Sequence, residues 1–264
     1  MAKADPPDLS GTPYRLLERT AHGEFGAWRA VDADGNRFVV KTGWSEAGRD
    51  ATKQLAAVGY PAPRYLLTRP GLCVQEELPG QPIGCWKALD DGLARQLLEL
   101  NAQLADRRVS DSPPWPRRLL NEMRSYNGWV DPTDLERHSE EGRELLRRCR
   151  TAVGRAELRD TGDLVHWDFT TSNVLVAGDR VTGVVDWDGA LNGDRIFDIA
   201  TLFYYTRTPL LREYALKRRD ARVFVAYLAH MILRQTSWSI RYHEPAAGEH
   251  LIGYGLELSE TFPA

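Results

Sequence analysis

Two short runs of residues in the second half of the chain have the types and spacing needed for chemistry on phosphate. The first is His166-Trp167-Asp168-Phe169-Thr170-Thr171-Ser172-Asn173, and the second is Val184-Val185-Asp186-Trp187-Asp188. Phosphoryl transfer from a nucleotide needs one carboxylate that orients the attacking hydroxyl. It also needs an asparagine and a second aspartate that hold the metal ions bridging the phosphates. The pattern H-x-D-x-x-x-x-N, followed by an apolar strand and an aspartate, predicts this chemistry.

The residues between the two runs predict a hairpin that brings their polar side chains together. Asn173 leads directly into an apolar strand, residues 177–180 are turn formers, and residues 181–185 return as a second strand. We therefore expect Asn173, at the start of the first strand, to lie near Asp186, at the end of the second. Two oxygen ligands on adjacent strand ends suit Mg²⁺, which keeps several waters and binds few protein groups.

Asp168 precedes Asn173 by five positions, in a loop where it can face an incoming hydroxyl while Asn173 faces the metal. We assign Asp168 as the candidate catalytic residue, and Asn173 and Asp186 as candidate metal ligands. Asp188 has two interpretations: a second metal ligand, or a solvated carboxylate next to the site. A hairpin with acidic turns would also explain these residues, since Asp and Asn favour turns. The complete pattern favours the functional interpretation.

These runs resemble the catalytic core of the protein-kinase-like fold, and more closely that of the aminoglycoside phosphotransferase family of antibiotic kinases. The resemblance implies an α+β protein of two lobes, with an N-terminal antiparallel β-sheet plus one helix and a mainly helical C-terminal lobe that carries the catalytic hairpin. It assigns residues 1–78 to a nucleotide-binding lobe and residues 79–264 to a catalytic and substrate-binding lobe. It further implies that His166 supports the loop and that Asp198 hydrogen-bonds the backbone of that loop.

The first eighty residues have the pattern of strands around one helix. Residues 14–20 and 25–31 are β-like, and a turn separates them from a third strand at residues 37–41, which ends in Lys41. This third strand resembles the kinase strand whose lysine pairs with the α- and β-phosphates. The resemblance therefore assigns Lys41 to nucleotide binding, although a lysine at a strand end is also an ordinary surface residue.

Two features of this region depart from the kinase pattern. Residues 21–26 lie where a phosphate-covering loop is expected and include two glycines, but they do not match G-x-G-x-x-G. The helix predicted for residues 45–58 has Gly48 where kinases have the glutamate that pairs with the strand lysine. Glu46 and Asp50 are both nearby, and the sequence does not choose between them.

The run from Cys73 to Gly80 resembles the hinge segment of the family. The resemblance implies that backbone groups of Glu76 and Leu78 bind the purine while their side chains face elsewhere. A strand that runs into a Pro-Gly turn is the structural alternative. Because backbone recognition leaves little trace in the side chains, both ATP and GTP remain open as the nucleotide.

The rest of the chain predicts helices, since apolar residues recur at helical spacing. The four predicted helices are residues 90–106, 117–126, 133–152 and 221–242. The apolar stripe of the last helix indicates core packing; it consists of Phe224, Leu228, Met231 and Trp238. Four acidic residues near the C-terminus suit either a cationic substrate or a solvated helix face; they are Glu244, Glu249, Glu257 and Glu260.

The composition is typical of a globular protein of the reducing cytosol. The 264 residues are 42% hydrophobic and 27% charged, with a net charge of -3, so no charge excess draws the chain to nucleic acid or anionic lipid. Cys73, Cys85 and Cys149 form no C-x-x-C and cannot all pair. With no signal peptide or long apolar run, we expect a cytoplasmic protein that does not span a membrane. No obligate protein partner is evident.

The resemblance implies a Mg²⁺-dependent kinase that moves the γ-phosphate of ATP or GTP to a hydroxyl of an antibiotic and so confers resistance. Aminoglycosides, basic peptide antibiotics and nucleoside antibiotics all remain open as substrates. A metabolite kinase acting on choline, homoserine or a sugar would use the same catalytic residues. Trp167 replaces the Arg of regulated protein kinases, and no A-P-E segment follows, which argues against that class. A non-catalytic pseudokinase is disfavoured because the full set of catalytic positions is present.

Overall fold

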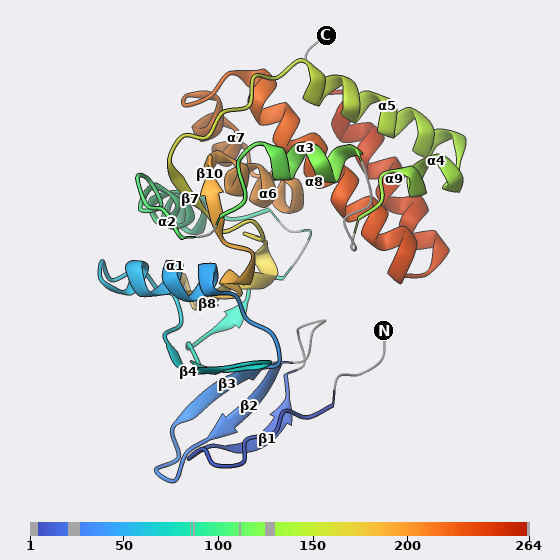
Figure 1. Cartoon of the computed structure of the whole chain (residues 1–264). Coiled ribbons are helices and arrows are strands. Elements are labelled where there is room, and N and C mark those ends of the chain that lie inside the picture. The colour runs from blue at the N-terminus through green and yellow to red at the C-terminus, as the bar shows by residue number, and fades with distance from the viewer. Residues whose placement is uncertain are drawn as a thin grey trace.

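The protein folds into two lobes that follow one another along the chain. The computed structural model describes residues 5–20, 27–84, 86, 88–110, 112–124 and 130–262. The N-terminal lobe is a β-sheet with one helix, and the C-terminal lobe is larger and mainly helical (Figure 1). The predicted α+β architecture of two lobes is thus confirmed. The boundary predicted between residues 78 and 79 falls in the connection between the lobes and stays a prediction.

The N-terminal sheet is antiparallel, with the order β1-β2-β3-β5-β4. Its strands are β1 (Arg15–Arg19), β2 (Ala27–Val31), β3 (Arg37–Lys41), β4 (Tyr65–Arg69) and β5 (Leu72–Glu76). The three predicted strands before residue 42 are confirmed. The candidate phosphate-covering loop, residues 21–26, lies outside the described residues.

Helix α1 (Glu46–Ala56) lies between the sheet and the helices of the other lobe (Figure 1). Ser45 caps it, because its hydroxyl accepts the N–H of Gly48 at 2.9 Å. The buried residues Ala51 and Leu55 of α1 belong to the large apolar core that extends through the C-terminal lobe. The sheet instead has a small apolar cluster of its own, made of Ala30, Val40, Leu72 and Val74. Helix α1 therefore packs with the C-terminal lobe.

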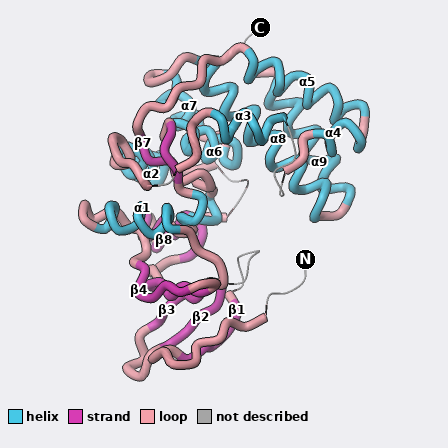
Figure 2. The backbone as a smooth tube through the Cα atoms, in the orientation of Figure 1, coloured by secondary structure: helices cyan, strands magenta, loops and turns pink. Residues whose placement is uncertain are grey.

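The C-terminal lobe contains most of the helices and of the buried apolar residues (Figure 2). They are α2 (Asp91–Ala102), α3 (Arg117–Arg124), α4 (Thr133–His138), α5 (Glu140–Gly154), α6 (Ile196–Thr206), α7 (Pro209–Leu216), α8 (Ala221–Tyr242) and α9 (Pro245–Ser259). Helix α8 packs against α5, α6 and α9. Its predicted core positions 224, 228 and 231 are buried, whereas Trp238 is half-buried. Within the described part of the chain, no helix has both the length and the apolarity to cross a membrane.

The single helix predicted for residues 133–152 is wrong, since the structure has two helices there. Ser139 interrupts the helix with φ of -160° and ψ of 171°, and its hydroxyl accepts the N–H of Gly142 at 3.0 Å. Gly142 lies against the Leu135 carbonyl, at a distance that leaves no room for a Cβ. The periodicity did not reveal the break, because no apolar residue lies between Leu135 and Leu145, so this stretch carries no apolar pattern that could be interrupted.

The predicted catalytic hairpin is confirmed. Strand β8 (Val174–Ala177) pairs with β9 (Arg180–Val184) and also with β6 (Gln81–Pro82), the short strand that follows the link between the lobes. Strand β7 (Asp163–Val165) pairs with β10 (Leu191–Gly193). The loop with Asp168 connects β7 to β8, and the turn with Asp186 connects β9 to β10. The two strand pairs therefore position the loop with Asp168 and the turn with Asp186.

Candidate active site

The structure places Asp168 and Asn173 in direct contact. The Asn173 side-chain amide donates to the Asp168 carbonyl at 2.9 Å and to its Oδ2 at 3.1 Å. The Thr170 N–H also donates to the Asp168 carbonyl at 2.8 Å, so the loop is closed by its own backbone. Since the Asn173 nitrogen is used in this way, its amide oxygen remains as the atom suited to a cation.

Asp186 lies beside this loop. The Val185 N–H donates to the Asn173 carbonyl at 2.9 Å, which aligns the start of β8 with the residue before Asp186. Asp186 itself has φ of 66° and ψ of 56°, a left-handed conformation that is uncommon for residues with a Cβ and is found often at functional sites. Its side chain is 45% exposed, so a metal ion can reach the carboxylate.

Lys41 reaches across from the N-terminal lobe to two acids of the C-terminal lobe. Its ammonium contacts Asp186 Oδ1 at 2.6 Å and also bonds Asp188 Oδ2. Burial by itself would lower the pKa of Lys41, but the two carboxylates raise that pKa, so the ammonium stays charged. Lys41, the candidate phosphate-binding residue, therefore lies next to Asp186, the candidate metal ligand.

Neither acid of α1 contacts Lys41. Glu46 pairs with Arg49 at 2.6 Å, and Asp50 accepts the N–H of Ser110 at 3.1 Å. Gly48, the position where kinases have the acid, lies against the backbone of Trp187. Both alternatives left open by the sequence are therefore wrong for this conformation, and the partners of Lys41 come from the catalytic turn.

His166 joins the loop to the strand end. Its Nδ1 accepts the N–H of Asp168 at 3.3 Å, so its Nε2 donates to the Val185 carbonyl at 2.9 Å. The side chain is fully buried, and burial lowers the pKa of His166. A neutral imidazole in this position supports the geometry of the loop, which confirms the structural role expected for His166.

Asp198 holds the same loop from the other side. Its two carboxylate oxygens accept the N–H groups of His166 at 2.8 Å and Trp167 at 3.1 Å. Asp198 is fully buried, and this burial raises its pKa to about 8 while the two N–H groups act in the opposite direction. Trp167 adopts a left-handed φ of 74° between these bonds. The role expected for Asp198 is confirmed.

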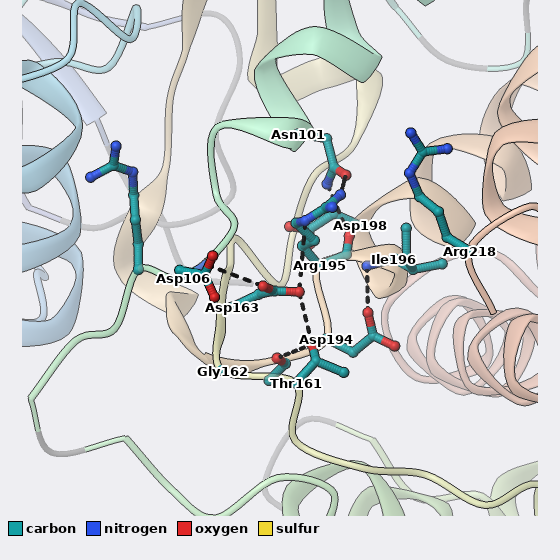
Figure 3. Close-up of polar contacts among 12 residues, drawn as sticks. Asn101, Asp106, Thr161, Gly162, Asp163, Asp194, Arg195, Ile196, Asp198 and Arg218 are labelled. Atoms are coloured by element: carbon teal, nitrogen blue, oxygen red, sulfur yellow. Dashed lines mark hydrogen bonds and ion pairs between the residues drawn. The ribbon is translucent and has the colours of Figure 1, made fainter.

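A polar network fixes the start of α6, the helix that carries Asp198 (Figure 3). Asn101 donates to the Arg195 carbonyl at 2.9 Å and accepts from the Arg195 guanidinium at 3.1 Å. Asp194 accepts the N–H of Ile196 at 3.0 Å. Because α6 is fixed at its first residues, the carboxylate of Asp198 is fixed relative to the loop.

Arg234 of α8 contacts the candidate catalytic residue, and no motif in the sequence marks it. One guanidinium nitrogen donates to Asp168 Oδ1 at 2.9 Å, and the other donates to the Trp167 carbonyl at 2.9 Å. An arginine on an amphipathic helix is typical of a solvated face, so spacing alone could not distinguish Arg234 from its neighbours.

Trp167 is the centre of a group of side chains next to Asp168. Its ring stacks on Phe197 with centroids 4.7 Å apart and planes at 12°, and the guanidinium of Arg118 lies 4.4 Å from the Trp167 ring centroid. Glu122, on the same helix as Arg118, is 3.0 Å from Nε2 of the buried His230. Helices α3 and α8 thus meet beside Asp168.

Of the predicted hinge residues, Glu76 ends β5 and Leu78 lies on the link between the lobes. The Glu76 carboxylate pairs with Arg64 at 3.1 Å. The Leu78 side chain packs against Gly183 of β9. The Glu76 N–H donates to the Arg64 carbonyl at 3.0 Å. The part assigned to their backbones in purine binding stays a prediction.

The donor set fits Mg²⁺ bound together with a nucleotide. No group of three or more His, Cys, Asp or Glu side chains suited to a metal occurs among the residues that the structure describes. Mg²⁺ does not need one, because it is commonly bound by one or two protein oxygens together with substrate phosphates and waters. The Asp186 carboxylate and the Asn173 amide oxygen are such hard ligands.

The sequence of residues 28–230 matches the profile of the phosphotransferase enzyme family. The chain belongs to this family. A curated relative of the phosphotransferase, hygromycin-B 4-O-kinase of Escherichia coli, is 43% identical over 42 residues. That alignment spans only 16% of the chain and 12% of the relative.

Solved structures share the fold of this phosphotransferase. A thermostable mutant of an aminoglycoside phosphotransferase, in a ternary complex with AMP-PNP and hygromycin B, has a TM-score of 0.67 at 18% identity and covers 93% of each chain. An ethanolamine kinase of Plasmodium vivax has a TM-score of 0.55 at 12% identity, over 94% of this chain and 81% of the other. Both are therefore similar along nearly the whole length of this chain.

Four predicted site residues of the phosphotransferase form two contact pairs, Lys41 with Asp186 and Asn173 with Asp168. The bond from the Val185 N–H to the Asn173 carbonyl joins the two pairs. The roles assigned to them remain to be tested. The C-terminal acidic residues are all exposed, and Glu257 lies 3.5 Å from Arg207. Exposure of the whole group favours the solvated helix face over a substrate contact.

Proposed function

We propose that this phosphotransferase moves the γ-phosphate of ATP to a hydroxyl of a small-molecule antibiotic, with Mg²⁺ as cofactor, and thereby confers resistance. The observation that carries the proposal is that Lys41 contacts Asp186 and Asn173 contacts Asp168, while the Val185 N–H bonds the Asn173 carbonyl and brings the two pairs side by side. Family membership and the likeness to an antibiotic kinase support it. GTP is the alternative nucleotide, since recognition of a purine by backbone groups of the hinge leaves little side-chain signature in the sequence.

Each of the predicted site residues has its own role in the phosphoryl transfer. Asp168 accepts the proton of the acceptor hydroxyl as its oxygen attacks the γ-phosphorus and the bond to the β-phosphate oxygen breaks, which releases ADP. Asn173 and Asp186 hold Mg²⁺, which neutralises the charge on the phosphates. Lys41 binds the α- and β-phosphates, and the backbone of Glu76 and Leu78 binds the purine.

We place this reaction in the cytoplasm, where ATP is available and thiols stay reduced. Cys73 and Cys149 are buried free cysteines, and burial raises the pKa of Cys73 to about 12, so this thiol is unreactive. Cys85 lies outside the described residues. The chemistry needs a hydroxyl-bearing small molecule as its substrate, with no nucleic acid, membrane or obligate protein partner.

A metabolite kinase of the same fold, acting on choline, homoserine or a sugar, is the second candidate. The likeness to an ethanolamine kinase supports it. The catalytic residues do not distinguish the two functions, because they would be identical in both. The two functions would differ in the residues that contact the acceptor substrate.

Mass spectrometry on a panel of acceptors tests the proposal. The purified protein is incubated with ATP and Mg²⁺, or with GTP and Mg²⁺, and with hygromycin B, further aminoglycosides, peptide and nucleoside antibiotics, choline, ethanolamine, homoserine and sugars. We expect a mass increase of one phosphate on an antibiotic, which is lost with Asp168→Asn. Phosphorylation of a metabolite alone would replace the proposal by the second candidate, and no product on any acceptor would reject both.

A further inference from the structure

We propose that Asp188 is the positioning partner of Lys41, in place of the helical acid that α1 lacks, and that it links the catalytic turn to the N-terminal lobe. This inference rests on the proposed function, because it assigns Lys41 to the nucleotide phosphates. It gives Asp188 a role that differs from both sequence-based interpretations, the second metal ligand and the solvated carboxylate.

The N–H and O–H donors to Asp188 come from Lys41, Ser45 and Tyr65 of the N-terminal lobe. Its Oδ2 bonds the Lys41 ammonium, and its Oδ1 accepts the hydroxyl of Tyr65 at 3.0 Å and the N–H of Ser45 at 3.3 Å. The Asp188 carbonyl accepts the hydroxyl of Ser45 at 2.8 Å. One residue of the catalytic turn is therefore bonded to the end of β3, the N-terminus of α1 and the start of β4.

The two acids of the turn differ in how they are engaged. The Asp188 side chain is 26% exposed and both of its oxygens have donors from the N-terminal lobe. The Asp186 side chain is 45% exposed and has Lys41 as its only ion-pair partner among the described residues. Carboxylate oxygens accept only a few bonds each, so Asp186 is the better placed of the two to bind Mg²⁺.

The packing of α1 explains why the partner comes from the turn. A Cβ at Gly48 would lie 2.6 Å from the Trp187 carbonyl oxygen, so no acidic side chain fits at this position. The same close approach brings the N-terminus of α1 onto residues 187–189. The helix dipole favours a carboxylate there, and the Ser45 N–H donates to Asp188. Close packing therefore removes the helical acid and supplies Asp188 in its place.

The arrangement has a consequence for catalysis. Mg²⁺ at Asp186 would share that carboxylate with Lys41, whereas both oxygens of Asp188 already accept donors from the N-terminal lobe. Asp188 would therefore hold the Lys41 ammonium in place when the metal and the phosphates bind.

A double-mutant cycle on nucleotide affinity tests this role. The dissociation constant of AMP-PNP is measured by calorimetry in excess Mg²⁺ for the wild type, Asp188→Asn, Lys41→Met and the double variant. If Asp188 acts through Lys41, Asp188→Asn weakens binding about tenfold and the double variant binds no more weakly than Lys41→Met. Independent, multiplying losses would overturn the inference, as would recovery of the Asp188→Asn loss at higher Mg²⁺, which marks a metal ligand.

Controls separate the role of Asp188 from general damage. Glu46→Gln and Asp50→Asn, on the acids of α1 that do not contact Lys41, should leave the affinity within about twofold. If Asp188→Asn does not fold, Tyr65→Phe and Ser45→Ala serve instead, because each keeps the Asp188 carboxylate but removes one hydroxyl that bonds Asp188. Unchanged affinity for AMP-PNP in both variants would overturn the inference.

The assay needs no acceptor, so it separates the inference from the proposed function. A wild type that binds AMP-PNP but phosphorylates no antibiotic rejects the proposed function, while the cycle still decides the role of Asp188. A wild type that does not bind nucleotide overturns both.

Discussion

Arg234 donates to Asp168 Oδ1 at 2.9 Å, while the other oxygen of that carboxylate accepts from Asn173 at 3.1 Å. A guanidinium from α8 and an amide from the loop therefore hold the candidate catalytic group from two sides. The second bond of Arg234, to the Trp167 carbonyl, fixes the guanidinium itself. The geometry of Asp168 thus depends on a helix that begins more than fifty residues after it.

Loss of the Asp168 carboxylate should abolish most turnover without affecting nucleotide affinity. We expect Asp168→Asn to lower kcat by about 10²–10⁴, the usual contribution of a general base, because the amide cannot accept the hydroxyl proton. Steady-state kinetics and calorimetry with AMP-PNP measure the two quantities, and circular dichroism confirms the fold. Turnover at the wild-type rate would show that Asp168 is not the base.

Arg234→Lys should lower kcat about tenfold or more with little change in the KM for nucleotide, because lysine cannot donate to both Asp168 and the Trp167 carbonyl in one fixed geometry. Arg222→Gln is the matched control, since Arg222 lies on the same helix and pairs with Asp220 at the surface. Equal kinetics for the Arg234 variant and the control would contradict a positioning role.

Asn173→Ala should raise the Mg²⁺ concentration needed for half-maximal activity, because it removes one of two proposed oxygen ligands. A chelator should abolish activity, and added Mg²⁺ should restore it. The measurement is the initial rate as a function of free Mg²⁺. Turnover that persists in the chelator, or an unchanged Mg²⁺ requirement in the variant, would contradict the ligand assignment.

Gly48→Ala should destabilise the protein by about 1–3 kcal/mol, because the new methyl would overlap the Trp187 carbonyl and push α1 away from the turn. It should also raise the KM for nucleotide, since Ser45 and Asp188 would separate. Gly154→Ala is the control: a Cβ there meets nothing within 4 Å. Denaturant unfolding measures both variants, and equal stabilities would show that the close approach at Gly48 carries no constraint.

The buried histidines should make the protein less stable in mild acid. Burial lowers the pKa of His230 below its ordinary 6.5, an effect to which Arg234 and Arg118 add and which Glu122 opposes. As pH falls through about 6.5, the unfolded chain therefore takes up a proton that the folded chain does not. This costs at most about 1.4 kcal/mol per pH unit.

The variant His230→Asn should lose less stability than the wild type between about pH 7 and 5.5, as measured by urea unfolding. Burial also lowers the pKa of His166, so part of the loss of stability in acid should remain in the variant. Asp198 acts in the opposite direction: its folded pKa of about 8 exceeds the ordinary 3.8, so it favours the folded state as pH falls through this window. Identical slopes for the two proteins would contradict the assignment to His230.

The sequence was sufficient for contacts formed within one supersecondary unit. Asp168, Asn173 and Asp186 belong to one loop and hairpin, so their spacing and the strand pattern predict their proximity. The strand that ends in Lys41 was recognisable for the same reason. The fold class was implied by the family resemblance that these motifs carry.

Contacts between distant segments could not be read in this way. Asp188 lies 147 positions from Lys41, and Arg234 lies 66 positions from Asp168. Their partners depend on how α1 and α8 pack, which periodicity does not determine. The break at Ser139 was missed because periodicity says nothing across residues 136–144, which contain no apolar residue. The signal that marks it is local: Ser139 followed by Glu140 and Glu141 is a helix-start pattern.

The separate apolar cluster of the N-terminal sheet has a further consequence for the catalytic cycle. The sheet can tilt without opening the large core, because α1 packs with the other lobe. Lys41, at the end of β3, lies at the border between these two bodies and is tethered across it to the catalytic turn. A tilt of the sheet would therefore stretch the bonds of Lys41 to Asp186 and Asp188.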